Sequence, residues 1–431
     1  MLRIRLLSAA LLLLATIGGT PSRVSAAQQE SISFHRFAGT TLGASDAQRV
    51  GTRVTRDGLL QLASSGLLAG SYTDPFGTAS VAYESGTWTS PWYATSFGFT
   101  ELVSSWNATT PAGTWLQVQM QATTNQGRPT KWYTLGIWAS GTDTIHRTSV
   151  GSQGDGDGTV AIDTFFAKDH PMISYRLMVT LFRRAGTSVS PTLRTIGAVA
   201  SDAPEVNEKP YIPSLPSGAE GVTLNVPTLS QEVHAGEYPE FDGGGEAWCS
   251  PTSTEMVVRY WGSGPTDAQV TAMPSSTALN APTPKQDPDV DYAAMHTYDA
   301  HFQGTGNWPF NTAYAASFGL DAEVTQLHSL AEAEQFISAG IPLVASIAFT
   351  ANQLPGFLFK SSDGHLLVIV GFTSAGDVVV NDPAAITDET VQRVYDRQAF
   401  ERAWLSATGG IVYVIHPSSV PLPPANHQPN W

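Results

Sequence analysis

The stretch GGGEAWCSPTSTEMVVRYWG, residues 243–262, contains Cys249, the only cysteine in the 431-residue chain. The residues after it predict a helix, because Ser250 is a suitable N-cap, Pro251 suits the first turn and Gly262 ends the apolar spacing. A helix start favours the thiolate form of a cysteine, since unpaired N–H groups and the macrodipole stabilise negative charge there. Cys249 is therefore a candidate nucleophile. The alternative interpretation is a buried thiol that packs as a small hydrophobe.

A thiol nucleophile needs an imidazole base, and the base needs a polar group that orients it. The stretch DGHLLVIVGFTSAGDVVVND, residues 363–382, has two apolar runs separated by a polar turn, which predicts an antiparallel hairpin. The hairpin brings His365 to the same end of the sheet as Asn381 and Asp382. Neighbouring strand residues point to opposite faces, so only one of this pair contacts the imidazole, and the turn alone does not choose between them.

The motifs WCSPTS, GHLLVIVGF and VNDP together resemble those of the papain-like, bacteriocin-processing peptidases that cleave after double glycine. These form cysteine peptidase family thirty-nine, and the resemblance is to its "like" branch of stand-alone secreted proteins. It covers about residues 222–417. The resemblance implies a nucleophile at Cys249, a base at His365 and an orienting carboxylate at Asp382, on a papain-like fold.

The lead-in NVPTLSQEVHAGE, residues 225–237, resembles the family's "VP…SQ" segment and puts Gln231 in the oxyanion hole. The chain departs from the family pattern in two ways. Cys249 follows Gln231 by 18 residues, a longer gap than usual, and the three glycines just before the cysteine fit a surface insertion there. In addition, Ser250 replaces the glycine that normally follows the nucleophile.

The N-terminal region, residues 31–200, has the pattern of an all-β sandwich, jelly-roll-like. GTWLQVQMQATT and ISYRLMVTLFRR alternate apolar and polar residues, which is typical of strands with one buried face. The rhythm of aromatic strands resembles β-sandwich modules found beside bacterial exported hydrolases. Exposed tryptophans could stack on sugars, whereas the alternative is that they pack in the core between the strands. Six of the eleven tryptophans fall here: Trp88, Trp92, Trp106, Trp115, Trp132 and Trp138.

The chain divides further by composition. Residues 1–27 have two arginines near the start, then an apolar run and small residues at the end, which predicts a cleaved signal peptide and a secreted, cell-wall or periplasmic protein with no later membrane span. Residues 201–221 contain four prolines and predict a linker. Helical and buried-strand patterns make residues 222–418 an α+β domain. The proline-rich residues 419–431 predict a flexible tail. The protein is thus expected to be multidomain.

Composition excludes several classes of protein. A formal charge of −15 argues against nucleic-acid binding, and a single cysteine excludes an internal disulfide. No cofactor or metal is expected. His234, His296, His301 and His328 lack a partner pattern and are interpreted as structural. The GDGDGT stretch around Asp155 and Asp157 fails the spacing of a calcium loop and predicts a tight polar turn.

These features together predict a secreted bacterial cysteine peptidase that hydrolyses peptide amide bonds through an acyl-enzyme. Its partner would be a peptide or protein, with cell wall or glycan as a further partner of the β-sandwich. Two alternatives stay open. One is a cell-wall amidase or endopeptidase acting on peptidoglycan stem peptides. The other is a secreted binding protein whose peptidase-like domain has lost turnover.

Overall fold

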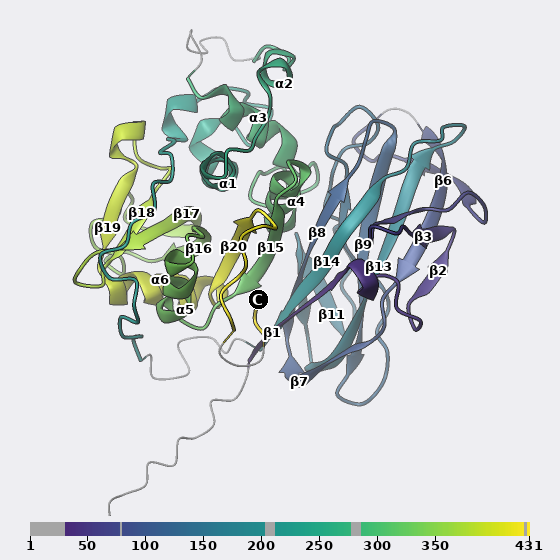
Figure 1. Cartoon of the computed structure of the whole chain (residues 1–431), viewed down its shortest axis with the longest axis horizontal. Coiled ribbons are helices and arrows are strands. Elements are labelled where there is room, and N and C mark those ends of the chain that lie inside the picture. The colour runs from purple at the N-terminus through teal and green to yellow at the C-terminus, as the bar shows by residue number, and fades with distance from the viewer. Residues whose placement is uncertain (1–30, 78–79, 203–211, 277–285, 426–428) are drawn as a thin grey trace, which may run out of the picture.

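The computed structural model describes residues 31–77, 80–202, 212–276, 286–425 and 429–431. In these residues an all-β unit and an α+β unit lie side by side (Figure 1), so the predicted multidomain fold class is confirmed. The predicted signal peptide lies outside the described residues. No helix in the described part of the chain has the length and apolar character that a membrane span requires.

The N-terminal unit consists of two antiparallel sheets. The strands of sheet A are β1 Ile32–Ala38, β3 Thr52–Val54, β4 Leu60–Leu62, β8 Glu101–Thr109, β11 Gly158–Ala161, β12 Thr164–Ala167 and β14 Thr192–Ser201. Those of sheet B are β2 Gln48–Val50, β5 Leu68–Thr73, β6 Ser80–Thr89, β7 Tyr93–Phe99, β9 Thr114–Thr124, β10 Tyr133–Trp138 and β13 Met172–Arg184. Sheet A has the order β11-β12-β8-β14-β4-β3, with β1 on β14. Sheet B has the order β10-β9-β13-β6-β2, with β5 on β6 and β7 on β13.

The core of this unit lies between the two sheets. Alternate residues of β13, such as Leu177, Val179 and Leu181, are fully buried and join a single apolar cluster with residues of sheet A. The alternation of apolar and polar residues along this strand therefore predicted correctly which side chains are buried. Most of the tryptophans predicted to lie here are also buried, namely Trp88, Trp106, Trp115 and Trp138.

The C-terminal unit has one antiparallel sheet of six described strands covered by helices on both faces. The strands are β15 Asp321–Gln326, β16 Leu343–Phe349, β17 Ser362–Phe372, β18 Val378–Asn381, β19 Gln392–Tyr395 and β20 Ile411–His416, in the order β15-β20-β16-β17-β18-β19. The helices are α1 Cys249–Tyr260, α2 Asp267–Thr271, α3 Pro288–Thr297, α4 Trp308–Ser317, α5 Leu330–Ser338 and α6 Arg397–Thr408. Apolar residues of α1, α3 and α4 share one cluster with the sheet, and those of α5 and α6 share another, so the sheet is buried on both faces.

The helix that carries the cysteine begins two residues earlier than predicted, because its N-cap is Trp248 rather than Ser250. Cys249 is its first residue, and Trp248 takes the N-cap position without a capping side-chain hydrogen bond. Ser250, predicted as the cap, instead lies inside the helix and shares a hydrogen bond with the Tyr413 hydroxyl at 2.9 Å, because its side chain faces β20. The end of the helix is as predicted, with Gly262 at a φ of 66° just beyond it.

The two units share an extensive interface along β8, β15 and α4 (Figure 1). The buried Asn107 side chain of β8 donates to the Ala322 carbonyl at 2.6 Å and accepts the Ala322 N–H at 3.1 Å. Strand β15 lies at the edge of its sheet, so this side chain satisfies backbone groups that would otherwise lack a partner strand. Phe310 of α4 packs against Trp106 and Trp138 of the sandwich, at ring-centroid distances of 6.2 and 5.4 Å.

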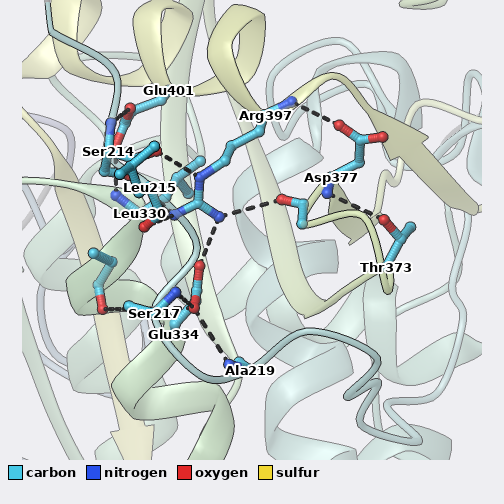
Figure 2. Close-up of polar contacts among 12 residues, drawn as sticks. Ser214, Leu215, Ser217, Ala219, Leu330, Glu334, Thr373, Asp377, Arg397 and Glu401 are labelled. Carbon is cyan, nitrogen blue, oxygen red and sulfur yellow. Dashed lines mark hydrogen bonds and ion pairs between the residues drawn. The ribbon is translucent and has the colours of Figure 1, made fainter.

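Residues 212–221, the described end of the predicted linker, dock on the α+β unit. Figure 2 shows the Arg397 guanidinium donating to the carbonyl of Ser214, at 2.9 Å from Nε, while the Glu334 carboxylate accepts the Ser217 N–H at 2.6 Å. Arg397 and Glu334 also form an ion pair with each other at 2.6 Å. This end of the linker is therefore anchored rather than loose, and the middle of it lies outside the described residues.

The last residues of the predicted flexible tail, 429–431, pack on the α+β unit. The Asn430 side chain donates to the Gln326 carbonyl at 2.9 Å, and the Trp431 ring packs on Phe336 with a centroid distance of 5.0 Å. Proline-rich composition indicated an unstructured segment. The terminal tryptophan nevertheless has enough apolar surface to join the core beneath α5, where only 9% of it stays exposed.

Candidate active site

Cys249 and His365 are brought together where α1 meets β17. The Ser253 hydroxyl, one turn after the cysteine, donates to the Leu366 carbonyl at 3.1 Å and joins the helix start to the strand that carries the histidine. The partly exposed thiol of Cys249 lies within hydrogen-bonding reach of the imidazole, which is itself almost fully buried. A helix start therefore presents the thiol to a base held in the wall of the sheet.

The imidazole is held between Cys249 and a carboxylate. His365 Nε2 lies 2.8 Å from Asp382 Oδ1, which leaves Nδ1 as the ring nitrogen for the thiol. Burial lowers the pKa of His365, but the charge and hydrogen bond of Asp382, helped by Cys249, raise it to about 10. The imidazolium form is thus strongly favoured at neutral pH.

Asp382, rather than Asn381, contacts the imidazole. The strands of the hairpin pair with Val368 opposite Asn381, and the chain leaves β18 at the next residue, so the Asp382 side chain turns towards His365. The Asn381 side chain instead donates to the carbonyls of Val226 and Pro227, both at 3.2 Å. It clamps the lead-in segment, which leaves orientation of the imidazole to Asp382.

Tyr395 is a member of the site that the sequence did not indicate. Its hydroxyl donates to Asp382 Oδ2 at 3.0 Å, and the Ala384 N–H donates to Oδ1 at 3.1 Å. Burial raises the pKa of Asp382, but the His365 charge and these hydrogen bonds outweigh it and hold that pKa below its usual range. The only sequence signal for Tyr395 was its place on a short strand, 13 residues beyond the aspartate.

The other side of the imidazole is lined by aromatic rings from the loop between β16 and β17. The Phe357 and Phe359 rings meet it edge-on, at centroid distances of 5.4 and 6.2 Å. Phe357 also stacks on Tyr395 at 5.5 Å. These rings keep water from the His365–Asp382 pair, which strengthens the electrostatic interaction between the two groups.

Gln231 lies beside the segment that leads to the cysteine. Its side-chain nitrogen donates to the Glu246 carbonyl at 2.7 Å, and its backbone N–H donates to the Pro383 carbonyl at 2.8 Å, one residue beyond Asp382. The residue is buried, and its amide nitrogen carries a second N–H. The structure therefore brings Gln231 to the same end of the sheet as the other three predicted site residues.

The long gap between Gln231 and Cys249 folds as a compact insertion, residues 232–247. Two 3-10 helices, Glu232–His234 and Gly245–Ala247, pack against each other in it. The glycine run has a steric cause, because a Cβ built on Gly245 would lie 2.7 Å from Cβ of His234 and 2.3 Å from the Gln231 carbonyl oxygen. His234, interpreted as structural from the sequence, lies within 3.2 Å of the buried carboxylates of Glu237 and Asp291.

Comparison with protein-family models identifies both halves of the chain. Residues 223–412 match the model described as the Peptidase_C39 like family, and residues 35–201 match the Peptidase C39 N-terminal domain. The C-terminal unit thus matches the Peptidase_C39 like family, and the N-terminal unit matches the domain that precedes such peptidases. The resemblance predicted from the sequence motifs is confirmed. The match over the C-terminal unit supports a function of the cysteine-peptidase type.

Comparisons with individual proteins add little to this family assignment. No curated protein matches the chain. A chain from the structure of infectious bursal disease virus Gt strain is 14% identical, with 44% of this chain and 38% of the viral chain covered at a TM-score of 0.19. A carbohydrate-binding module of the β-sandwich superfamily is 10% identical, with 37% and 59% covered at a TM-score of 0.17. Scores this low carry no argument about the sandwich.

Proposed function

We propose that the protein is a cysteine peptidase that hydrolyses peptide amide bonds through a covalent acyl-enzyme. Cys249 is the nucleophile, His365 the acid and base, and Asp382 the group that orients the imidazole. The observation that carries the proposal is the continuous line of contacts from the thiol through the imidazole to the carboxylate. A structural thiol would not need a buried imidazole whose carboxylate partner is fixed by two further donors.

In the first half-reaction the Cys249 thiolate attacks the carbonyl carbon, and the imidazolium gives its proton to the departing amine. The products are the thioester and a neutral imidazole. In the second half-reaction the imidazole takes a proton from water as the water attacks the thioester. The acid is released and the thiol–imidazole pair is restored. Asp382 stays ionised throughout and stabilises the imidazolium.

The developing oxyanion would be held by two donors. The backbone N–H of Cys249 has no partner inside its own helix, because it belongs to the first turn. The Gln231 amide, whose N–H would turn from the Glu232 carboxylate to the substrate, is the other donor. One such donor lowers the activation free energy by roughly 3–4 kcal/mol in comparable sites. The tight packing of Gln231 against the insertion supports this role, since it limits the rearrangement that this donor needs during reaction.

The experiment that tests the proposal is hydrolysis of a mixed peptide library by the full chain and by variants. Cys249→Ala and His365→Ala should abolish release of new amino termini while leaving circular dichroism unchanged. Gln231→Ala should slow it by about a hundredfold or more. A parallel digest of peptidoglycan separates the cell-wall alternative, because cleavage of stem peptides alone would favour it. If the folded protein hydrolyses neither substrate, the remaining alternative is a binding protein with an inactive peptidase-like domain.

We also propose that the protein is exported and that its sandwich contacts the cell wall or a glycan. The observation behind glycan contact is the pair Trp92 and Trp132 on either side of Arg176, with the guanidinium 4.7 and 5.0 Å from the two rings. Trp92 is 43% exposed, unlike the buried tryptophans of the core. Sedimentation with insoluble cell wall should retain the full chain and lose the Trp92→Ala variant. Sequencing of the secreted amino terminus should start near residue 27 or 28.

A further inference from the structure

The insertion between Gln231 and Cys249 contains a cluster of three buried ionisable side chains that the proposed mechanism does not use. His234 and Glu237 come from the insertion, and Asp291 comes from α3. One ligand atom of each lies within 4.8 Å of the other two, and none of the three side chains is more than 1% exposed. The sequence could not have indicated the cluster, because Asp291 lies 57 residues beyond His234.

The geometry around His234 is that of a shared ligand position rather than a single hydrogen bond. The same nitrogen, Nδ1, lies 3.2 Å from Glu237 Oε2 and 3.1 Å from Asp291 Oδ1. The carboxyl groups of Glu237 and Asp291 also contact each other within hydrogen-bonding range. Three groups in mutual contact thus surround one point. Two buried carboxylates this close together require positive charge between them.

Two kinds of occupant can supply that charge. With two protons, one on the imidazole and one shared by the carboxyl groups, the cluster is neutral. With one divalent cation, a neutral imidazole and two carboxylates, it is also neutral. Atoms that lie just over 3 Å apart around a common centre match neighbouring ligands on a metal, because metal–nitrogen and metal–oxygen bonds are about 2.0–2.2 Å long for zinc.

We propose that His234, Glu237 and Asp291 bind a divalent cation of the zinc class. An imidazole nitrogen with two carboxylate oxygens suits such a borderline ion, whereas calcium takes six to eight oxygen ligands and magnesium retains several waters. A second oxygen of either carboxylate can bring the coordination number to four. The bound cation releases two protons, one from the imidazole and one from the carboxyl pair.

The cation would fasten the insertion to α3 directly behind the proposed oxyanion hole. The ring of His234 lies 6.0 Å from that of Trp248, the residue before Cys249, and His234 packs on the Gly245 backbone. Loss of the cation would therefore loosen both ends of the insertion, where Gln231 and Cys249 lie. This role is structural and separate from the peptidase chemistry, so it can be tested without measuring turnover.

The test uses the full chain with Cys249→Ala, which removes the one thiol that could bind zinc elsewhere. After chelation and dialysis, addition of zinc should give one bound equivalent by elemental analysis, a higher Tm and about two protons released by calorimetry in buffers of different ionisation enthalpy. Asp291→Asn should lose the bound equivalent and the Tm increase. His328→Gln is the matched control, because His328 Nδ1 lies 3.1 Å from a single carboxylate, Glu332, and this variant should bind zinc normally.

X-ray absorption at the zinc edge decides the question even if Asp291→Asn does not fold. A first shell of one imidazole nitrogen with carboxylate oxygens supports the proposal. Absence of bound zinc, a shell with two or more imidazoles, or equal loss of zinc in His328→Gln would overturn it. In that event the cluster is held together by protons.

Discussion

The imidazole of His365 and the carboxylate of Asp382 lie 2.8 Å apart at the end of the central hairpin, and both are buried. Their partners extend this contact in both directions, to the Cys249 thiol on one side and to the Tyr395 hydroxyl and the Ala384 N–H on the other. One ion pair therefore fixes the charge, the tautomer and the orientation of the proposed base.

Asp382→Ala should lower kcat/KM more than Asn381→Ala does. Removal of the carboxylate leaves the imidazole without its charge partner, and the loss should be roughly a hundredfold or more, the usual contribution of a positioned acid–base group. Asn381→Ala removes two hydrogen bonds to the Val226 and Pro227 carbonyls. It should lower the free energy of unfolding by about 1–3 kcal/mol and leave most of the turnover. Peptide hydrolysis and thermal melts of both variants distinguish the two roles, and the opposite ranking would assign orientation to Asn381.

The pH profile of hydrolysis should reflect the raised pKa of His365. The imidazolium is the proton donor to the leaving amine, so kcat/KM should fall at alkaline pH, with a midpoint near the pKa of about 10. Because this pKa is raised on folding, its contribution to stability is complete below about pH 6.5 and is lost as the pH rises through 10. Asp382→Asn should shift the alkaline limb towards lower pH. An unchanged limb would show that another group controls it.

Glu255 should destabilise the folded protein as the pH rises. Burial raises its pKa to about 8, and the Tyr314 hydrogen bond and the Arg259 charge only partly offset this. Between about pH 4.5 and 8 the unfolded chain loses the proton that the folded chain keeps, so stability falls with increasing pH. Glu255→Gln should therefore raise Tm, and by more at pH 8 than at pH 5. The exposed Glu240→Gln serves as the control, and an equal effect of the two substitutions would contradict the account.

Asn107→Ala should weaken the interface between the two units. The substitution leaves the N–H and carbonyl of Ala322 in edge strand β15 without their partner, at a cost of roughly 1–3 kcal/mol for each buried group. We expect a lower Tm with little change in kcat/KM well below the transition. Asn125→Ala, in an exposed turn of the sandwich, is the matched control and should have little effect.

Much of this site could be predicted because its members occupy positions with local signals. Cys249 starts a helix and precedes Pro251, and His365 and Asp382 border continuous apolar strands. Those patterns fix which end of an element a side chain occupies. They do not fix which of two adjacent residues faces inward, and so Asn381 and Asp382 could be separated only by the observed register.

Features that depend on contacts distant in sequence could not be predicted. The cluster around His234 needs Asp291 from another helix, and the docking of Phe310 on the sandwich needs the relative placement of two domains. The contact of Trp431 with Phe336 at the end of the proline-rich tail is of the same kind. The residues around Ser250 predict an N-cap at that position. In the structure the Ser250 hydroxyl is instead buried and shares a hydrogen bond with the Tyr413 hydroxyl.

The central claim is that Cys249 is an activated nucleophile, and its alkylation in the native protein tests this most directly. We would treat the native full chain and the His365→Ala variant with iodoacetamide across a pH series and map the adduct by peptide mass spectrometry. The account predicts that native Cys249 reacts at pH values well below those at which an ordinary thiol reacts, and that His365→Ala removes this advantage. A thiol that is modified only after denaturation would identify Cys249 as a buried structural residue and contradict the peptidase mechanism.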